Sequence, residues 1–298
     1  MLSRQGHQFS PYDGAMSAIK WKAKDAARCI IVPSELDHKY SRGTLGVITG
    51  SAQYPGAAVL STSAAVATGL GALRFHSNSG LAHLVLHQTP EALVQPGPVT
   101  AWLAGSGISL KKYSDFTTWL RHRWFVLLDR QSVPTVLDAG ALHLAGSLEQ
   151  PTLITPHAGE LSKLLEARGL IASAELIESN PGEWAQKASE LLAVTVLLKG
   201  STTYVAQDGY VIELPVATPW LATAGSGDVL GGIIGALVAT NYIEILNDVT
   251  RLADVAATGA FIHNRAALIA SGGATGKGPI SASSIISAIP EAIGKILA

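Results

Sequence analysis

Cysteine is almost absent from the chain, with Cys29 as the one cysteine among 298 residues. An intramolecular disulfide is therefore excluded, and so is a zinc site built from several thiolates. The nine histidines show no metal-ligand spacing either. The scarcity of cysteine fits the reducing cytoplasm, where we expect the protein to act.

Charged residues and long apolar runs are also scarce. Asp, Glu, Lys and Arg make up 14% of the residues and the net charge is −1, so nothing marks a nucleic-acid binder. The most apolar run, Val229–Ala239, is too short to cross a bilayer. The first thirty residues carry several charges and no long apolar stretch, so we expect no secretory signal. We expect a soluble protein with neither nucleic-acid nor membrane partners.

Two common nucleotide-binding motifs are missing. Gly276-Lys277 lacks the P-loop spacing, and Gly278 follows where Ser or Thr would be needed. No G-x-G-x-x-G segment follows a predicted first strand, so a dinucleotide site of the Rossmann type is unsupported. Any nucleotide site must use other loops.

Apolar residues (48%) and 30 glycines are abundant, and they suit a large core with many tight turns. Nearly continuous apolar runs alternate with helical patterns, which is typical of a mostly parallel sheet covered by helices on both faces. The predicted strands are Leu45–Thr49, Leu73–His76, Leu84–His87, Val99–Leu103, Thr135–Asp138, Thr152–Ile154, Thr195–Lys199, Thr203–Ala206 and Val211–Leu214. The predicted helices are Pro55–Thr68, Ser109–Leu128, Glu160–Arg168, Gly182–Leu192, Ser226–Thr240, Leu246–Ala270 and Ser281–Ala298.

The pattern predicts a single domain spanning residues 1–298, because neither a linker nor a repeat interrupts it. Asp208-Gly209 in the middle of Thr202–Leu214 predicts an antiparallel hairpin there. Residues 1–25 are polar and irregular. We expect them to form a loose arm or a helix packed on a partner.

The most informative segment is Gly225-Ser226-Gly227-Asp228, which leads directly into an apolar helix. A flexible turn at a helix start offers backbone N–H groups and the positive end of the helix dipole to an anion. A carboxylate beside such an anion hole suits the base of a phosphoryl-transfer enzyme. The alternative is an ordinary helix start, where Asp is common as a capping residue.

Two loops of small residues follow predicted strands, at the sheet edge where α/β proteins bind ligands. The first begins at Gly50 and leads into a helix that contains Ala57, and the second is Gly105-Ser106-Gly107. Small residues let a ligand approach the backbone closely. The alternative for each loop is an ordinary turn of the chain, and taken alone the first loop favours it.

Two polar segments follow later strands. In Thr155-Pro156-His157-Ala158-Gly159-Glu160, the spacing puts His157 and Glu160 on one side of a starting helix. One could touch a substrate while the other orients Mg²⁺ through water, or both could be capping or exposed residues. Lys199, followed by Gly200-Ser201-Thr202-Thr203, suits a nucleotide phosphate. Its alternative is a solvated hairpin edge.

Taken in order, these segments resemble the ADP/ATP-dependent NAD(P)H-hydrate dehydratases of the ribokinase-like superfamily, from about His38 to the C-terminus. The Gly-x-Gly-Asp element marks the superfamily alone. The Thr-Pro-His-x-Gly-Glu element with Lys-Gly-x-x-Thr is more specific to the dehydratases. The resemblance implies a three-layer α/β/α sandwich with a mostly parallel central sheet. It also implies a homo-oligomer, a tetramer by analogy with family members.

The resemblance implies a hydro-lyase that repairs nicotinamide nucleotides. Such an enzyme removes water from the S-form of hydrated NADH or NADPH (NADHX or NADPHX), using ADP or alternatively ATP, and releases AMP and phosphate when ADP is used. Asp228 would deprotonate the ring hydroxyl, and the anion hole would hold the phosphoryl group with Mg²⁺ neutralising charge. Phosphate is a better leaving group than hydroxide, so its elimination restores the reduced ring.

The resemblance also assigns residues to these roles. The catalytic group is Gly225, Ser226, Gly227 and Asp228. The hydrate-binding positions are Ala57, Gly107, His157 and Asp228. The nucleotide-binding positions are Lys199, Gly200, Ser201, Thr202, Thr203 and Gly227. Glu160 matches a position linked indirectly to Mg²⁺, and Asp138 is expected to position the phosphates or support the site.

The chain departs from the family pattern in places. Ser106 stands where the family often has proline, and Ala224 and Trp220 stand where many members have glycine. These departures bear on the substrate pocket more than on the reaction class. Some relatives carry an epimerase in the same chain. With 298 residues we expect a separate epimerase protein as functional partner.

Two rival functions remain open. One is an ATP-dependent kinase of a small alcohol, of the hydroxyethylthiazole, pyridoxal or sugar type, which would share the fold and the Gly-x-Gly-Asp site. His157 and the reaction product separate it from a dehydratase. The other is an inactive nucleotide-sensing module, against which an intact Asp228 and Lys199 argue.

Overall fold

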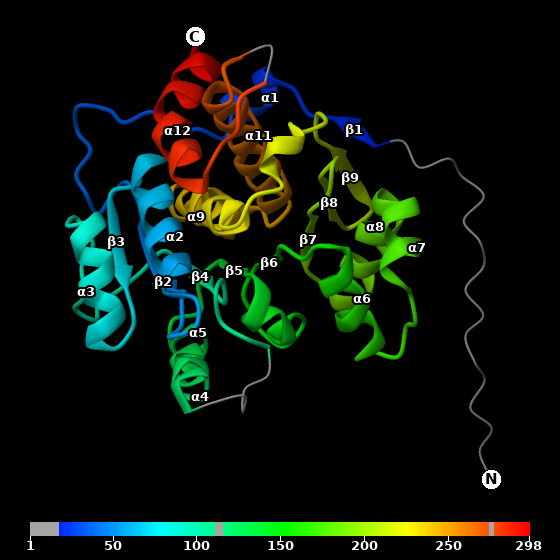
Figure 1. Ribbon diagram of the computed structural model, residues 1–298, viewed down its shortest axis with the longest axis horizontal. Helices are drawn as coiled ribbons and strands as arrows, with labels where there is room; N and C mark the ends of the chain where they lie inside the picture. Colours follow the sequence, from blue (N-terminus) through cyan, green and yellow to red (C-terminus); the bar gives the residue numbers. More distant parts are fainter. Residues whose placement is uncertain (1–17, 111–115, 274–276) are drawn as a thin grey trace.

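The computed structural model describes residues 18–110, 116–273 and 277–298. Within them one nine-stranded sheet runs through the molecule (Figure 1), in the order β1-β9-β8-β7-β6-β5-β4-β2-β3. The strands are β1 Ile19–Lys20, β2 Thr44–Ile48, β3 Ala72–Phe75, β4 Ala101–Ala104, β5 Thr135–Leu137, β6 Thr152–Ile154, β7 Thr195–Leu198, β8 Tyr204–Gln207 and β9 Tyr210–Glu213.

The sheet is mostly parallel, as the apolar runs predict. The described strand pairs are parallel except for the two that β8 makes with β7 and β9. Every residue of β2, β4 and β7 is buried, because helices cover both faces of the sheet. The predicted hairpin is confirmed: Asp208 and Gly209 join β8 to β9 with φ of 48° and 79°.

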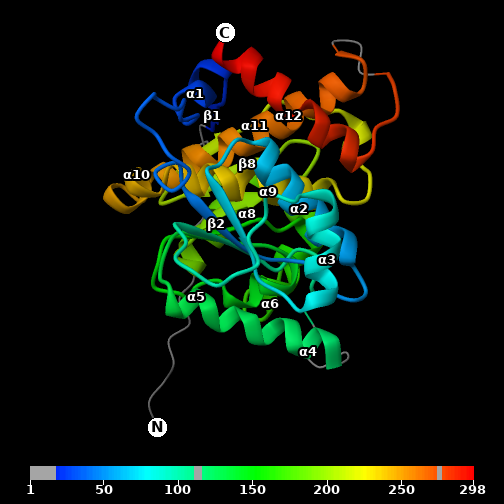
Figure 2. The ribbon, with the colours of Figure 1, turned by 90° about the vertical axis from the view of Figure 1, so that its left-hand side faces the viewer.

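Helices form the two outer layers. One core lies under α1, α2, α9, α11 and α12, and a second lies under α5 to α8 on the other face. Figure 2 shows α4 and α5 on the side opposite α11 and α12. The α-helices are α1 Ala23–Ala27, α2 Pro55–Ala67, α3 Ser79–Gln88, α4 Phe116–His122, α5 Val126–Arg130, α6 Ala158–Glu166, α7 Ala174–Ser179, α8 Pro181–Leu192, α9 Ser226–Thr240, α10 Tyr242–Asn247, α11 Arg251–Ala270 and α12 Ala282–Leu297. The 3₁₀ turns are η1 Arg123–Phe125, η2 Ala139–Leu144 and η3 Pro219–Leu221.

Helix α9 packs against β2, β4 and β5, and its glycines allow close approach to its neighbours. A Cβ on Gly232 would collide with the carbonyl oxygen of Ser61 in α2, and one on Gly235 would crowd Leu45 in β2. The helix is buried along most of its length. Its first turn, which carries Asp228, is therefore held rigidly against the sheet.

One predicted strand is wrong: Leu84–His87 lies in helix α3. Leu81 and Val85 are the buried residues of this helix and are spaced four apart, which fits a helical face. Asn78 caps its start by accepting a hydrogen bond from the Leu81 N–H at 3.2 Å. The short continuous apolar run Leu84-Val85-Leu86 gave the false strand pattern.

Two predicted helices are broken. Leu246–Ala270 is interrupted by extended backbone at Asp248, so α10 ends at Asn247 and α11 begins at Arg251. The Asp248 carboxylate accepts a hydrogen bond from the Thr250 N–H at 3.0 Å and stabilises the break. Ser109–Leu128 includes residues 111–115, which lie outside the described residues, and continues as α4, η1 and α5. The other predicted elements lie within two residues of their expected bounds.

The loose-arm alternative for the N-terminal segment is wrong for its described part. Residues 1–17 lie outside the described residues, but β1 pairs in parallel with β9 and α1 follows it. The strand is two residues long, too short for an apolar pattern to reveal it. The short helices α1 and α7 also escaped prediction. Among the described residues, no helix combines the length and apolar character that spanning a membrane would require.

Candidate functional site

The loop before α9 takes the conformation that its glycines allow. Gly225 has φ of 85°, a left-handed conformation, and a Cβ there would collide with Leu60 of α2. Helix α9 begins at Ser226, as predicted, and Asp228 lies in its first turn. The positive end of the helix dipole is therefore directed at this loop. The turn has the geometry of an anion site with a carboxylate beside it.

Asp228 has the electrostatics of a general base. Burial raises the pKa of its carboxyl to about 6, the nearby Asp138 charge adds to this, and Lys199 opposes it. The carboxylate is thus largely ionised at neutral pH yet more basic than an ordinary aspartate. Such a pKa lies near the operating pH, which favours proton abstraction.

A neutral histidine lies behind the loop. The Nε2 atom of His263 in α11 is 3.3 Å from the Ser226 hydroxyl. Burial lowers the pKa of His263 to about 4, so the ring is uncharged at neutral pH. The sequence pattern does not reveal this contact, because His263 lies within an apolar helix, 37 residues after Ser226.

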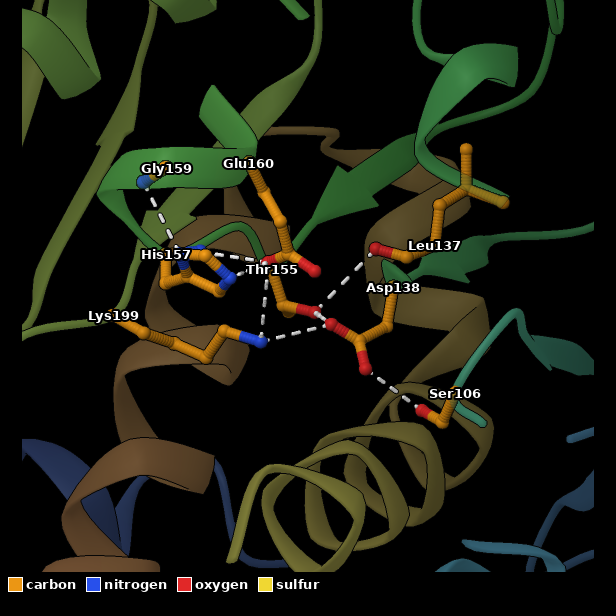
Figure 3. Close-up of polar contacts among 8 residues, drawn as sticks. All are labelled: Ser106, Leu137, Asp138, Thr155, His157, Gly159, Glu160 and Lys199. Atoms are coloured by element: carbon orange, nitrogen blue, oxygen red, sulfur yellow. Dashed lines mark hydrogen bonds and ion pairs between the residues drawn. The ribbon is translucent and has the colours of Figure 1, made fainter. Parts of the chain in front are cut away.

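The centre of the site is the buried carboxylate of Asp138 (Figure 3). Its Oδ1 accepts hydrogen bonds from Lys199 Nζ and Thr155 Oγ1, both at 2.9 Å. Its Oδ2 accepts one from Ser106 Oγ at 2.9 Å. Burial opposes ionisation, but the Lys199 charge and these hydrogen bonds hold the pKa of Asp138 below its usual value. Asp138 therefore joins three strand ends as a fixed negative charge.

Lys199 follows β7 and lies between two carboxylates. Its Nζ is 2.9 Å from Asp138 Oδ1 and 3.8 Å from Glu160 Oε2. Burial alone would lower the pKa of Lys199, but the charges of Asp138 and Glu160 raise it. A Cβ on Gly227 would lie 3.9 Å from Lys199 Nζ. The structure thus brings the predicted phosphate-binding lysine to the predicted anion loop.

His157 and Glu160 form the start of α6. His157 is the N-cap, and its Nδ1 accepts a hydrogen bond from Gly159 N at 3.1 Å (Figure 3). Glu160 Oε2 accepts one from His157 N at 3.0 Å and lies 3.5 Å from His157 Nε2. This reciprocal pair is a capping box. Both residues therefore cap the start of α6, and Glu160 also contacts Lys199.

The two loops of small residues that follow β2 and β4 lie against each other. Gly107 has φ of 67°, and a Cβ there would collide with the Cβ of Ala57. Gly50 N donates a hydrogen bond to the carbonyl oxygen of Ser106 at 2.7 Å, which joins the loops after β2 and β4. Ala57 and Gly107, each expected to border the hydrate, therefore lie directly against each other.

Arg121 in α4 holds the loop after β2 in place, and its role is not predicted from the sequence. Its side chain is buried and donates hydrogen bonds to the carbonyl oxygens of Thr49 and Gly50 at 2.8 Å and of His76 at 3.0 Å. These partners lie 45 to 72 residues away along the chain, so spacing gives no signal for them. Burial lowers the pKa of Arg121 to about 10, which leaves it charged at neutral pH.

The loop Gly200–Thr203 connects β7 to β8 beside Lys199. Ala217 N donates a hydrogen bond to Ser201 O at 3.0 Å, which ties this loop to the segment before η3. Trp220, one of the departures from the family pattern, lies in η3 with 41% of its surface exposed.

No three His, Cys, Asp or Glu side chains gather to hold a metal ion in the described part of the chain. Mg²⁺ in nucleotide sites is commonly held by one or two carboxylates together with substrate phosphates. Glu160 fits such a role, because its carboxylate lies beside Lys199, where a phosphate would be drawn.

Comparison with known proteins identifies relatives. The family model described as NAD(P)H-hydrate dehydratase matches residues 45–290. The "Bifunctional NAD(P)H-hydrate repair enzyme Nnr" of Mycobacterium tuberculosis is 39% identical over 234 residues, covering 74% of this chain and 46% of that protein. The "ADP-dependent (S)-NAD(P)H-hydrate dehydratase" of Neisseria meningitidis serogroup B is 30% identical over 253 residues, covering 78% and 79%. The chain spans about half the length of the bifunctional relatives.

Solved structures share the fold. An ADP/ATP-dependent NAD(P)H-hydrate dehydratase from Bacillus subtilis, co-crystallised with ATP/Mg²⁺, matches with a TM-score of 0.78 and 22% identity, covering 95% of this chain and 100% of that one. A ribokinase-like superfamily protein from Enterococcus faecalis V583 matches with a TM-score of 0.77 and 21% identity, covering 97% and 99%. The expected ribokinase-like three-layer α/β/α fold is confirmed.

Proposed function

The chain belongs to the NAD(P)H-hydrate dehydratase family, and on this basis we propose that it removes water from the S-form of NADH or NADPH hydrate. ADP is the proposed co-substrate, with ATP as the alternative. Support for ADP and for the S-form comes from the name of the Neisseria relative. The observation that carries the proposal is the partly buried carboxyl of Asp228, whose raised pKa of about 6 occurs beside the glycine loop and Lys199.

Asp228 acts as the base in this proposal. It takes the proton of the ring hydroxyl, whose oxygen then bonds to the terminal phosphorus of ADP while the bond to AMP breaks. The nitrogen electron pair expels the new phosphate group, and loss of a ring proton restores the double bond. Gly225, Ser226 and Gly227 hold the moving phosphoryl group through the start of α9.

The remaining residues position the two substrates. Lys199 holds a nucleotide phosphate with one of its three N–H donors while another stays on Asp138. Residues 200–203 contact the nucleotide, and His157, Ala57 and Gly107 border the hydrate. Mg²⁺, when bound through the phosphates and oriented by Glu160, neutralises phosphate charge.

The wider setting is proposed from the same family membership. The enzyme would act in the cytoplasm as a single domain and as a homo-oligomer, a tetramer by family resemblance. A separate epimerase would supply the S-form of the hydrate. The fusion of two activities implied by the name of the bifunctional relatives supports this functional link.

The direct test measures absorbance of the reduced nicotinamide ring. Purified protein with Mg²⁺, ADP or ATP, and NADH hydrate should restore the absorbance of NADH and release AMP and phosphate in the ADP reaction. If the ring is not restored, while a phosphorylated small alcohol accumulates in a panel of vitamin precursors and sugars, the kinase interpretation replaces this proposal.

Asp228→Asn tests the proposed base. Because a positioned general base contributes roughly 100- to 10,000-fold, we expect kcat to fall by about that factor. ADP affinity, measured by calorimetry, should stay nearly unchanged because Lys199 and residues 200–203 are intact. Asp208→Asn, the same change at the exposed tip of the β8–β9 hairpin, is the matched control and should keep wild-type kcat. Unchanged turnover in Asp228→Asn would remove this residue from the mechanism.

A further inference from the structure

The two oxygens of the Asp138 carboxylate hold opposite sides of the site (Figure 3). Oδ1 is bonded to Lys199 on the proposed nucleotide side, and to Thr155. Oδ2 is bonded to Ser106 on the proposed hydrate side. Asp138 and Ser106 are both buried, so water cannot readily replace either partner. A rotation of this carboxylate must therefore change hydrogen bonds on both sides of the site.

Ser106 transmits such a movement to the two small-residue loops on the proposed hydrate side. It lies between Gly105 and Gly107, whose φ values of 108° and 67° fix the loop in a conformation that few other residues adopt. Its carbonyl oxygen accepts the Gly50 N–H at 2.7 Å, and Gly107 packs on Ala57. The loop around Ser106 is thus tightly enclosed, and its side chain is attached to Asp138.

Lys199 passes a movement from the nucleotide side. Its ammonium lies between Asp138 and Glu160, so an arriving phosphate must share a cation that two carboxylates already hold. Attraction toward the phosphate lengthens or reorients the bond to Asp138. The carboxylate then depends more on its hydrogen bonds from Ser106 and Thr155, because a buried charge needs its remaining partners.

We propose that Asp138 is a positioning residue, and that its hydrogen bond with Ser106 couples the binding of the adenine nucleotide to the binding of the nicotinamide nucleotide. The inference rests on the proposed function, since it takes these two ligands as the occupants of the two sides.

The test measures the affinity of the protein for ADP with and without saturating NADH, by calorimetry. In the wild type we expect NADH to change the dissociation constant of ADP by about fivefold or more, the lower end of typical coupling between sites. ADP must change the affinity for NADH by the same factor, because coupling is reciprocal. In Ser106→Ala the factor should fall toward one, while each ligand alone keeps its affinity within about threefold.

Two further variants make the result specific. Ser189→Ala removes another buried hydroxyl hydrogen bond, from Ser189 Oγ to Val194 O at 2.7 Å in α8, and should keep the wild-type coupling factor. Ser106→Cys keeps the size of the side chain but has a weak S–H donor, so it should also lose coupling. It decides the question if Ser106→Ala does not fold.

Two results would overturn the inference: a coupling factor of one in the wild type, or a wild-type factor in folded Ser106→Ala or Ser106→Cys. The coupling measurement needs no turnover, so it is independent of the dehydration assay. A protein that binds both nucleotides with coupling but never restores NADH from its hydrate would disprove the proposed function and retain the link through Ser106.

Discussion

At the scale of single residues, the sequence identifies the polar groups but not their partners. Asp228, Lys199 and the Thr155–Glu160 segment each follow a recognisable pattern, and the structure brings them to one edge of the sheet. The contact of Ser106 with Asp138 spans 32 residues, and that of Arg121 with Gly50 spans 71. Such contacts depend on which strands become neighbours, and local spacing carries no information about that.

The pKa of Asp228 predicts how the rate depends on pH. Burial, with the Asp138 charge, places this pKa at about 6, and a base must be ionised to act. We therefore expect kcat/KM for NADH hydrate to be constant near pH 8 and to fall about tenfold per pH unit well below pH 6. The measurement is the initial rate of NADH formation across this range.

Asp138→Asn tests the cause of that shift. The variant removes a negative charge that raises the Asp228 pKa and releases Lys199, whose positive charge lowers it. Both changes lower the pKa of Asp228. The fall of kcat/KM at acid pH should therefore begin at a lower pH, even though the maximal rate drops. If kcat/KM falls over the same pH range as in the wild type, Asp138 is excluded as a cause of the raised Asp228 pKa.

At the scale of elements, the helix starts are well specified by sequence and the helix breaks are not. Ser226 begins α9 as predicted, because a glycine turn followed by an apolar run is a strong local signal. The break at Asp248 depends on one side chain that bonds to Thr250 instead of continuing the helix. Helix α3 was mistaken for a strand because a short apolar run does not distinguish the two periods.

The contact between α9 and α11 predicts sensitivity to acid. The folded-state pKa of His263, about 4, lies below its ordinary value of 6.5, so the folded protein binds fewer protons between these values. Its contribution to stability is present above pH 6.5 and is lost as the pH falls toward 4. In His263→Gln, urea unfolding should show up to about 2 kcal/mol less loss of stability between pH 7 and pH 4.5 than in the wild type.

His83→Gln, the same substitution on the exposed face of α3, is the control for this effect. It should follow the wild-type pH dependence, since its ring is not enclosed by other elements. His76 keeps part of the acid sensitivity in every variant, because burial and the charges of Arg74 and Arg121 lower its pKa to about 4. If the His263→Gln protein loses stability with falling pH as steeply as the wild type, His263 in α11 is not a source of the acid sensitivity.

At the scale of the whole molecule, the alternation of strands and helices predicts the layered, mostly parallel architecture, but not the strand order. The sheet runs from β1 at one edge to β3 at the other, so the first strand of the described chain lies beside β9. A two-residue strand has no periodicity of its own. Its place is set by tertiary contacts, and therefore the predicted loose arm is wrong for residues 18–25.

Trp21 provides the test of this N-terminal closure. It follows β1, its backbone N–H donates a hydrogen bond to Glu213 O at 3.0 Å, and its side chain is buried in the core that lies under α1. Because truncation of a buried Trp leaves a large cavity, we expect Trp21→Ala to lower the free energy of unfolding by about 3 kcal/mol or more in urea. Leu36→Ala, at a side chain that is 93% exposed, should change it by less than about 0.5 kcal/mol. Equal stability of both variants would mean that the N-terminal segment is not part of the fold in solution.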